Sequence, residues 1–278
     1  MSPRADAIAP SSAPSVAGRR GGTERLRTAG ELLLPFAVTA VAWELFAAFG
    51  PLPPRLFPSL ATIARTFLGL VASGVLLAHA QGTILRLVAG FALAAVLGVA
   101  AGLLMGRFRW AEDVLLPLVS IGSPIPGLAY APLFILWFGL GNLPAVLLVA
   151  VAASFPAAVN TWTGVKAVKE IWIRAAEAMG APESQLFRNV ILPGALPYVL
   201  TGLRLALARA WRVLVAVEML TSVPRGLGWL IFGAREFLNT DVMLAGIAVI
   251  GIIGLLLERV VFERLERFTV VRWGMLQA

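Results

Sequence analysis

Long apolar runs separated by short polar stretches fill most of this chain. The runs lie at approximately 32–50, 86–106, 114–138, 144–162, 197–220 and 242–260. A helix needs about 20 residues to cross the hydrocarbon layer of a bilayer, so each run is long enough for one crossing. The pattern therefore predicts an all-α integral membrane protein with about six transmembrane helices.

A weaker apolar stretch at 66–78 follows the proline-rich sequence GPLPPRLFPS. It is too short for a crossing of its own. A seventh crossing there would also move the later basic loops to the opposite side of the membrane. We expect this stretch to form an interfacial helix at the outer face.

The overall composition is typical of a membrane protein, whereas the first 30 residues are polar. The chain is 59% hydrophobic and 14% charged, whereas soluble domains carry roughly 25% charged residues. Residues 1–30 are polar, with Ser, Ala, Pro and Gly dominating their first part, and they show no cleavable signal peptide. We expect 1–30 to be a disordered basic tail and 31–278 to be the membrane domain, with its core at about 80–262.

The basic residues are distributed unevenly over the predicted loops. Fifteen Lys and Arg fall on the side that holds both termini, and five fall on the other side. Basic residues concentrate in cytoplasmic loops of membrane proteins. We expect both termini to be cytoplasmic.

The sequence offers little chemistry for catalysis or metal binding. It has no cysteine, and its single histidine, His79, cannot form a two-histidine metal site. Its only lysines, Lys166 and Lys169, do not end a phosphate-binding glycine loop. We expect that this chain is not an enzyme and binds no metal. Any chemical energy for transport must then come from another chain.

Residues 170–193, which we call the polar block, interrupt the membrane-type sequence. The stretch EIWIRAAEAM consists of good helix formers, and Gly180 follows where a helix end favours positive φ. Pro182 and Glu183 suit the start of a second helix, which we expect Pro193 to end. The second helix has an apolar stripe of Leu186, Phe187, Val190 and Ile191.

The polar block carries a recognisable spacing. Its two alanines are followed by Gly180 and then by V-x-L-P, and we expect Ala175 and Ala176 to face outwards, where small side chains let a partner approach. This spacing resembles the coupling motif of permease subunits in binding-protein-dependent ABC importers. The positions that match or adjoin it are Arg174, Ala175, Ala176, Glu177, Gly180, Ala181, Pro182, Leu192 and Pro193. Arg174 stands where the motif has glutamate, so the resemblance implies no carboxylate contact there.

The resemblance extends over roughly residues 55–272 and is strongest to the taurine, alkanesulfonate and nitrate branch. The segments that carry it include SPIPGLAYAPLFILWFGLG, RGLGWLI and EFLNTDVMLAGIAVI. It implies the type I importer permease fold, a homodimer, two ATP-binding subunits that hold ATP-Mg, and an extracytoplasmic solute-binding protein. It also implies translocation of a small anion by alternating access, with taurine or an alkanesulfonate as first choice and nitrate as second.

Polar and helix-breaking residues within the runs are candidates for lining a solute path. The sequence SIGSPIPGLAYAP breaks the third run, and broken helices of transporters lie at the solute path. The candidates are Ser120, Ser123, Pro124, Tyr130, Asn160, Arg209, Arg212 and Glu218. The alternatives are a packing kink, hydrogen bonds between helices, and charges that pair with other helices or snorkel.

A rival function is an ion-coupled secondary carrier that works without an ATPase. Glu44 and Glu218 are available as intramembrane ion sites. However, the two halves show no inverted repeat, and this function leaves the polar block without a role.

Overall fold

The computed structural model describes residues 22–262, and no β-strand occurs among them. The chain divides into two compact units, Met1–Pro51 and Leu52–Ala278. The α-helices are α1 (Gly22–Phe49), α2 (Leu60–Ala72), α3 (Val75–Arg107), α4 (Arg109–Gly122), α5 (Ala131–Phe138), α6 (Asn142–Lys166), α7 (Glu170–Ala178), α8 (Glu183–Leu186), α9 (Leu192–Glu218), α10 (Leu227–Glu236) and α11 (Thr240–Leu256). A π-helical turn, Leu257–Phe262, extends α11.

The first unit contains helix α1, which begins inside the segment expected to be a disordered tail. That expectation is wrong for residues 22–30. Glu, Arg and Leu, which favour helix, precede the apolar run, and no proline occurs between Gly22 and Pro35, so the helix extends backwards from that run. Residues 1–21 of the expected tail, and 263–278 at the other end, lie outside the described residues.

Four helical segments of the described chain are long and apolar enough to cross a membrane: α3, α6, α8 with α9, and α11. A fifth crossing results if the bent pair α4 and α5 counts as one span. The first expected crossing, 32–50, coincides with α1, whose apolar stretch Leu33–Phe49 is short against the ~20 residues of a typical span. The all-α membrane fold is confirmed, and the crossing at 32–50 stays a prediction.

The weak apolar stretch at 66–78 is divided between two helices. Helix α2 ends at Ala72, Gly74 has a φ of +75°, and α3 already begins at Val75. The expected start of the second span at residue 86 is therefore too late. Helix α2 is tied to the start of α11 by a hydrogen bond from Thr66 Oγ1 to Asp241 Oδ2, 2.6 Å long.

The predicted break in the third span is confirmed. Helix α4 ends at Gly122, a short 3-10 turn covers Gly127–Tyr130, and α5 continues at an angle of 97° to α4. Pro124 and Pro126 lie at the break, where each lacks the backbone N–H that a continuous helix would use.

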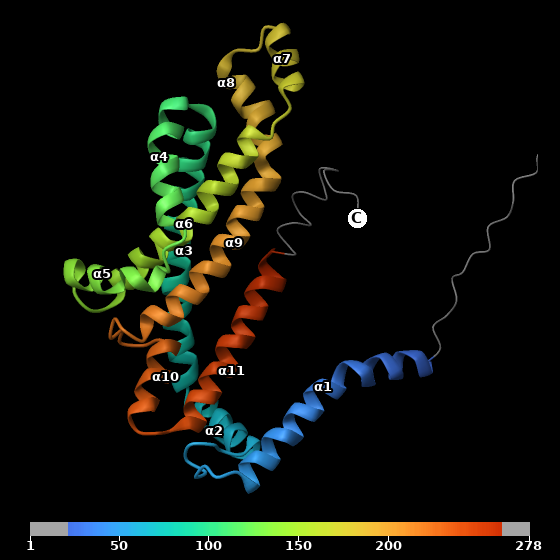
Figure 1. Ribbon diagram of the computed structural model, residues 1–278, viewed down its shortest axis with the longest axis vertical. Coiled ribbons are helices and arrows are strands. Elements are labelled where there is room, and N and C mark those ends of the chain that lie inside the picture. Colours follow the sequence, from blue (N-terminus) through green and yellow to red (C-terminus); the bar gives the residue numbers. More distant parts are fainter. Residues whose placement is uncertain (1–21, 263–278) are drawn as a thin grey trace, which may run out of the picture. The chain divides into compact units, whose positions relative to one another are not determined.

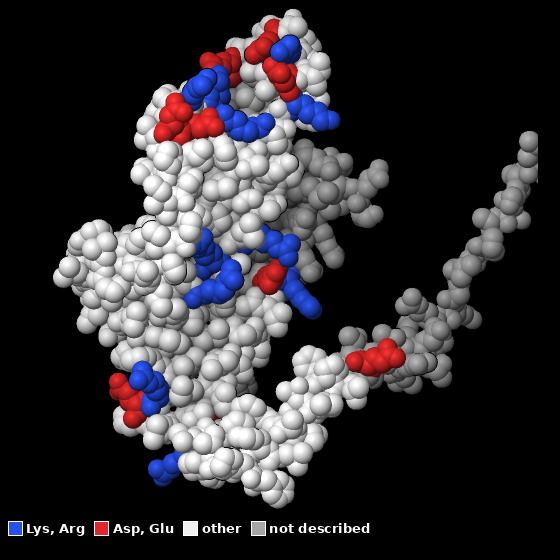
Figure 2. Space-filling view, viewed as in Figure 1, with Lys and Arg blue, Asp and Glu red and all other residues white. Residues whose placement is uncertain are grey.

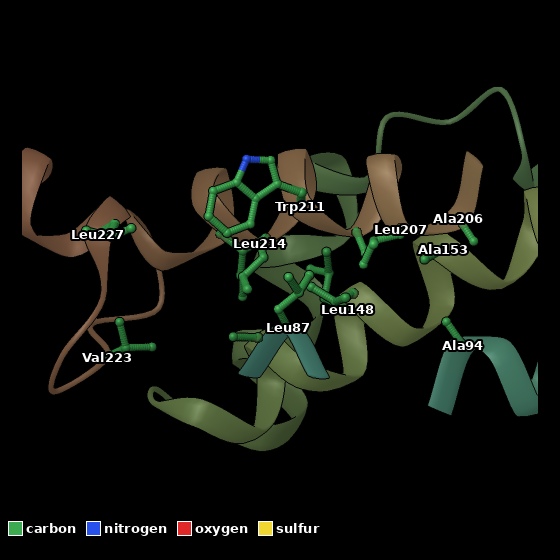
Figure 3. Close-up of a cluster of buried hydrophobic side chains, with 14 of the residues drawn as sticks. Leu87, Ala94, Leu148, Ala153, Ala206, Leu207, Trp211, Leu214, Val223 and Leu227 are labelled. Atoms are coloured by element: carbon green, nitrogen blue, oxygen red, sulfur yellow. The ribbon is translucent and has the colours of Figure 1, made fainter. Parts of the chain in front are cut away.

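Helices α3, α6 and α9 lie side by side and form the core of the second unit (Figure 1). Gly90, Gly98, Gly102 and Gly106 recur along one face of α3, against α6. A Cβ atom added at any of them would come within 2.4–2.7 Å of an α6 side chain. Membrane helices associate through such small residues because lipid supplies no hydrophobic drive between helices. Leu87, Leu148 and Leu214 meet at one end of this contact (Figure 3).

We expect Gly102→Ala to destabilise the fold. Its Cβ would lie 2.5 Å from Thr161 Cβ and 2.6 Å from the Ala158 carbonyl oxygen, so the two backbones must separate. Overpacking of this kind costs about 1–3 kcal/mol. Thermal unfolding of the purified chain in detergent should show a lower midpoint. Gly251→Ala, in α11 with open space around its Cβ, is the control and should leave the midpoint unchanged.

Candidate functional site: the polar block and the polar residues of the spans

The polar block contains the two short helices expected from the sequence, and they meet at Gly180. Gly180 has a φ of +79°, which is unfavourable for other residues. The Ala181 N–H donates to the Ala176 carbonyl and the Gly180 N–H to the Glu177 carbonyl. This pair of bonds is the Schellman motif, in which glycine ends a helix. Helix α8 then begins after Pro182, whose carbonyl accepts from the Gln185 N–H.

The inner face of the polar block packs on the ends of two long helices. Ala176, Leu186 and Ile191 are buried against Val165 of α6 and Ala195 of α9. The apolar stripe predicted for the second helix is confirmed, since Phe187 and Val190 pack on the same cluster. The expectation that Ala176 faces outwards is wrong. Successive helical residues lie 100° apart, so only Ala175 of the pair is exposed.

One exposed face of α7, together with its C-cap residue Met179, is apolar. Ile171 is 67% exposed, Trp172 51% and Met179 80%. Exposed apolar residues in such a group mark an interaction surface. Of the remaining motif positions, Arg174, Glu177, Gly180 and Pro182 are exposed, and Ala181, Leu192 and Pro193 are partly buried.

The polar block continues into α9 without a break, contrary to the expectation that Pro193 ends its second helix. One helical stretch of 36 residues runs from Glu183 to Glu218. A π-helical turn at Phe187–Ile191 precedes the proline, and the Leu192 N–H donates to the Phe187 carbonyl, five residues back. The wider turn accommodates Pro193 at the start of α9. The block is thus a direct extension of a span.

Charged side chains gather around the polar block, and an uncharged zone separates them from a second group of charges near the middle of the view (Figure 2). Three ion pairs lie at this end of the molecule: Arg107–Glu183, Lys166–Glu112 and Arg174–Glu170. Arg107 belongs to α3, so the first pair joins the block to a second long helix. Exposed pairs are worth about 0–1 kcal/mol each, and only Arg107–Glu183 joins the block to another helix, so the apolar cluster is the main attachment of the block.

The polar candidates near the break in the third span differ in their contacts and exposure. Arg209 of α9 donates through Nη2 to the carbonyl oxygens of Ser123 (2.7 Å) and Ile125 (3.3 Å). These carbonyls lie at the break, so Arg209 satisfies backbone that the proline-rich sequence leaves unpaired. Ser120 and Pro124 are exposed, whereas Ser123 and Tyr130 are partly buried.

Asn160 and Arg212 both bond within their own helices. Asn160 Nδ2 donates to the Pro156 carbonyl, 2.8 Å away, and the side chain is partly buried. Arg212 Nε donates to the Ala208 carbonyl, 3.0 Å away, and the side chain is exposed.

Glu218 does not line a path, because its side chain is completely buried in this chain. It pairs with Arg86, whose Nη2 lies 2.6 Å from Oε1. Thr83 Oγ1 and the Gly228 N–H donate to Oε2, each at 3.0 Å. The alternative in which an intramembrane charge pairs with another helix is confirmed for this residue.

Sequence reasoning counted Arg86 among the five basic residues on the side opposite the termini and missed this pair. Arg86 lies within α3, is 7% exposed at its side chain, and also donates to Asn142 Oδ1 at 2.8 Å. The polar residues that precede it, including His79 and Thr83, concealed the true start of the helix. The sequence did contain a signal for this pair. Arg86 and Glu218 carry opposite charges and lie in separate apolar runs, and a charge that is buried needs a partner.

These features define a polytopic, all-helical membrane protein in which a structured polar block extends one span. Residues 94–268 match the family described as "Binding-protein-dependent transport system inner membrane component". The chain belongs to this family of ABC transporter permeases. Such a permease is a transport component and not an enzyme, and the ATPase is a separate subunit. A carrier that works without an ATPase, the rival function, is therefore excluded.

Three named relatives match more than half of the chain. It is 39% identical to "Taurine transport system permease protein TauC" of Escherichia coli (strain K12), over 85% of both chains. It is 36% identical to "Putative aliphatic sulfonates transport permease protein SsuC" of Bacillus subtilis (strain 168), over 92% of this chain and 91% of the relative. The "Nitrate import permease protein NrtB" of Synechocystis is 32% identical over 63% of both chains.

A solved structure supports the fold. A chain of the MetNI methionine ABC transporter in an inward-facing conformation superposes with a TM-score of 0.58 at 20% identity, covering 73% of this chain and 98% of that one. The type I importer permease fold implied by the sequence is confirmed.

We expect Glu218→Leu to destabilise the chain by about 3–5 kcal/mol, because Arg86 is left charged and buried without its partner. The double variant Glu218→Leu with Arg86→Met should recover at least half of that loss, since it leaves no unpaired charge. Unfolding in mixed micelles with increasing SDS measures both. A double variant no more stable than the single one would show that the pair is not the cause.

Proposed function

We propose that two copies of this chain form the membrane path of an ATP-driven importer in a bacterial inner membrane. Two ATP-binding subunits work at the face of the polar block, and an extracytoplasmic binding protein delivers the solute to the other face. Both termini are cytoplasmic in this proposal. The support is the family membership and the fifteen basic residues on the side of the termini and the block.

The uncovered apolar face of α7 is the observation that carries the proposal. Ile171, Trp172 and Met179 are exposed on a block that has its own packed inner face and continues into α9. The ATP-binding subunit, which alone holds ATP-Mg, contacts this face. Closure of the two ATP-binding subunits moves the blocks, and the attached spans switch between inward-facing and outward-facing states. Arg174, Ala175, Glu177 and Pro182 are exposed beside the contact.

We expect Ile171→Asp to reduce co-purification of the ATP-binding subunit by at least tenfold. The substitution places a charge on the apolar face, and aspartate is tolerated in the first turn of α7, so the block itself should remain folded. Phe237→Asp is the control, because Phe237 is 75% exposed at the end of α10, away from the polar block. Equal recovery of the subunit with both variants would refute α7 as the contact.

The solute we propose is a small oxyanion or a small molecule with one sulfonate group, with taurine or an alkanesulfonate first and nitrate second. The similarity to named relatives supports this order. The taurine and sulfonate permeases are 36–39% identical to this chain, and the nitrate permease is 32% identical. Ser120, Pro124 and Arg212, which are exposed, remain proposed contacts of the path, as do Ser123, Tyr130 and Asn160, which are partly buried.

A strain that lacks this chain should fail to grow when taurine or ethanesulfonate is the only sulfur source and should grow on sulfate. The wild-type gene should restore growth, and Gly180→Pro should not. Gly180 has positive φ, which proline cannot adopt, so the joint between α7 and α8 is lost. Failure with nitrate as the only nitrogen source, with normal growth on sulfonates, would reverse the order of solutes.

A further inference from the structure

A cleft of about 350 Å³ lies between α9 and the end of α11. Its walls include Arg204, Ala208, Trp211, Arg212, Gly254 and Glu258. This volume falls in the range of small-molecule sites, which begins at roughly 300 Å³.

Arg204, Ala208 and Arg212 follow one another at intervals of four and share one face of α9. The two arginines are about 12 Å apart along the helix axis, from the 1.5 Å rise per residue. Both are exposed, and they lie within a segment long and apolar enough to cross the membrane. Charges at such a depth are rare and mark solute or ion pathways when they face a cavity.

The cleft offers more donors than its own acceptors use. Arg204 pairs with Glu258 at 3.7 Å. Arg212 makes one hydrogen bond, to the backbone of its own helix, and no carboxylate of the described residues pairs with it. The Arg212 guanidinium therefore has N–H donors that no described lining residue uses.

Trp211 adds a neutral donor. Its ring packs on the buried cluster, while the indole nitrogen lies on the side of the ring turned away from that cluster (Figure 3). Gly254 of α11 makes room for it, since a Cβ there would be 2.9 Å from Nε1. Within residues 22–262 this N–H has no hydrogen-bond acceptor.

We propose that this cleft binds the oxyanion group of the transported solute, an inference that rests on the proposed function. Arg212 and the Trp211 N–H donate to its oxygens, and the Arg204–Glu258 pair closes the other end of the cleft. A planar guanidinium suits two oxygens of one sulfonate or nitrate group.

The test uses the complex of this chain with its ATP-binding subunits in lipid nanodiscs, without binding protein. Ethanesulfonate is titrated by calorimetry at constant ionic strength. We expect the wild type to bind it and Arg212→Gln to weaken binding by at least tenfold, with Arg212→Lys in between. Arg65→Gln is the matched control, because Arg65 also donates through Nε to the carbonyl four residues back but lies on α2, outside the cleft.

A second readout separates binding from folding. With the binding protein added, Arg212→Gln should elute with its ATP-binding subunits at the wild-type volume in size-exclusion chromatography and take up ethanesulfonate at least tenfold more slowly. Equal ethanesulfonate affinity of Arg212→Gln and wild type overturns the inference. So does dissociation of the two permease copies in Arg212→Gln, which would make Arg212 a contact between copies.

Failure of the proposed function has a different signature. A wild-type complex that shows no ATP-dependent uptake of any sulfonate or of nitrate would overturn that function and this inference together. A wild-type complex that imports ethanesulfonate but does not bind it without the binding protein overturns the cleft alone.

Discussion

The close approach of α3 and α6 is the constraint on which the rest of the second unit depends. Apolar side chains gain little by leaving lipid for another helix, so the helices must gain contact area instead. Glycine at 90, 98, 102 and 106 lets the two backbones approach until α6 side chains fill the space of the missing Cβ atoms. Helix α9 packs on the same α6 through Gly164 and Gly202, which completes the three-helix core.

The polar residues inside this core mostly serve the structure itself. Arg86 and Glu218 neutralise each other at the end opposite the polar block and fix the turn at Gly226–Gly228, where glycine leaves room for the carboxylate. Arg209 satisfies the carbonyls of the broken third span. Arg212 differs from these residues, since no buried partner holds it. Its exposure directs attention to the cleft between α9 and α11.

Helix α9 connects the two places where function is proposed. The polar block is continuous with its first turns, and the cleft arginines lie further along the same helix. The inner face of the block is also anchored on α6, and Arg107 of α3 pairs with Glu183. A displacement of the block by an ATP-binding subunit would therefore reach the cleft through rigid, packed helices. Switching between two discrete arrangements of packed elements is how such displacements travel through proteins.

The sequence by itself determined the helical membrane class, the break in the third span, and the two short helices that meet at Gly180. These features depend on local properties: apolar runs long enough to cross lipid, prolines without a donor, and a glycine at positive φ. The tertiary structure alone decided that Ala176 faces inwards, that Pro193 is absorbed by a π-helical turn, and that Glu218 pairs with Arg86. Each of these depends on which distant helix lies alongside, because a side chain's partner across 132 residues is set by packing and not by its neighbours in the chain.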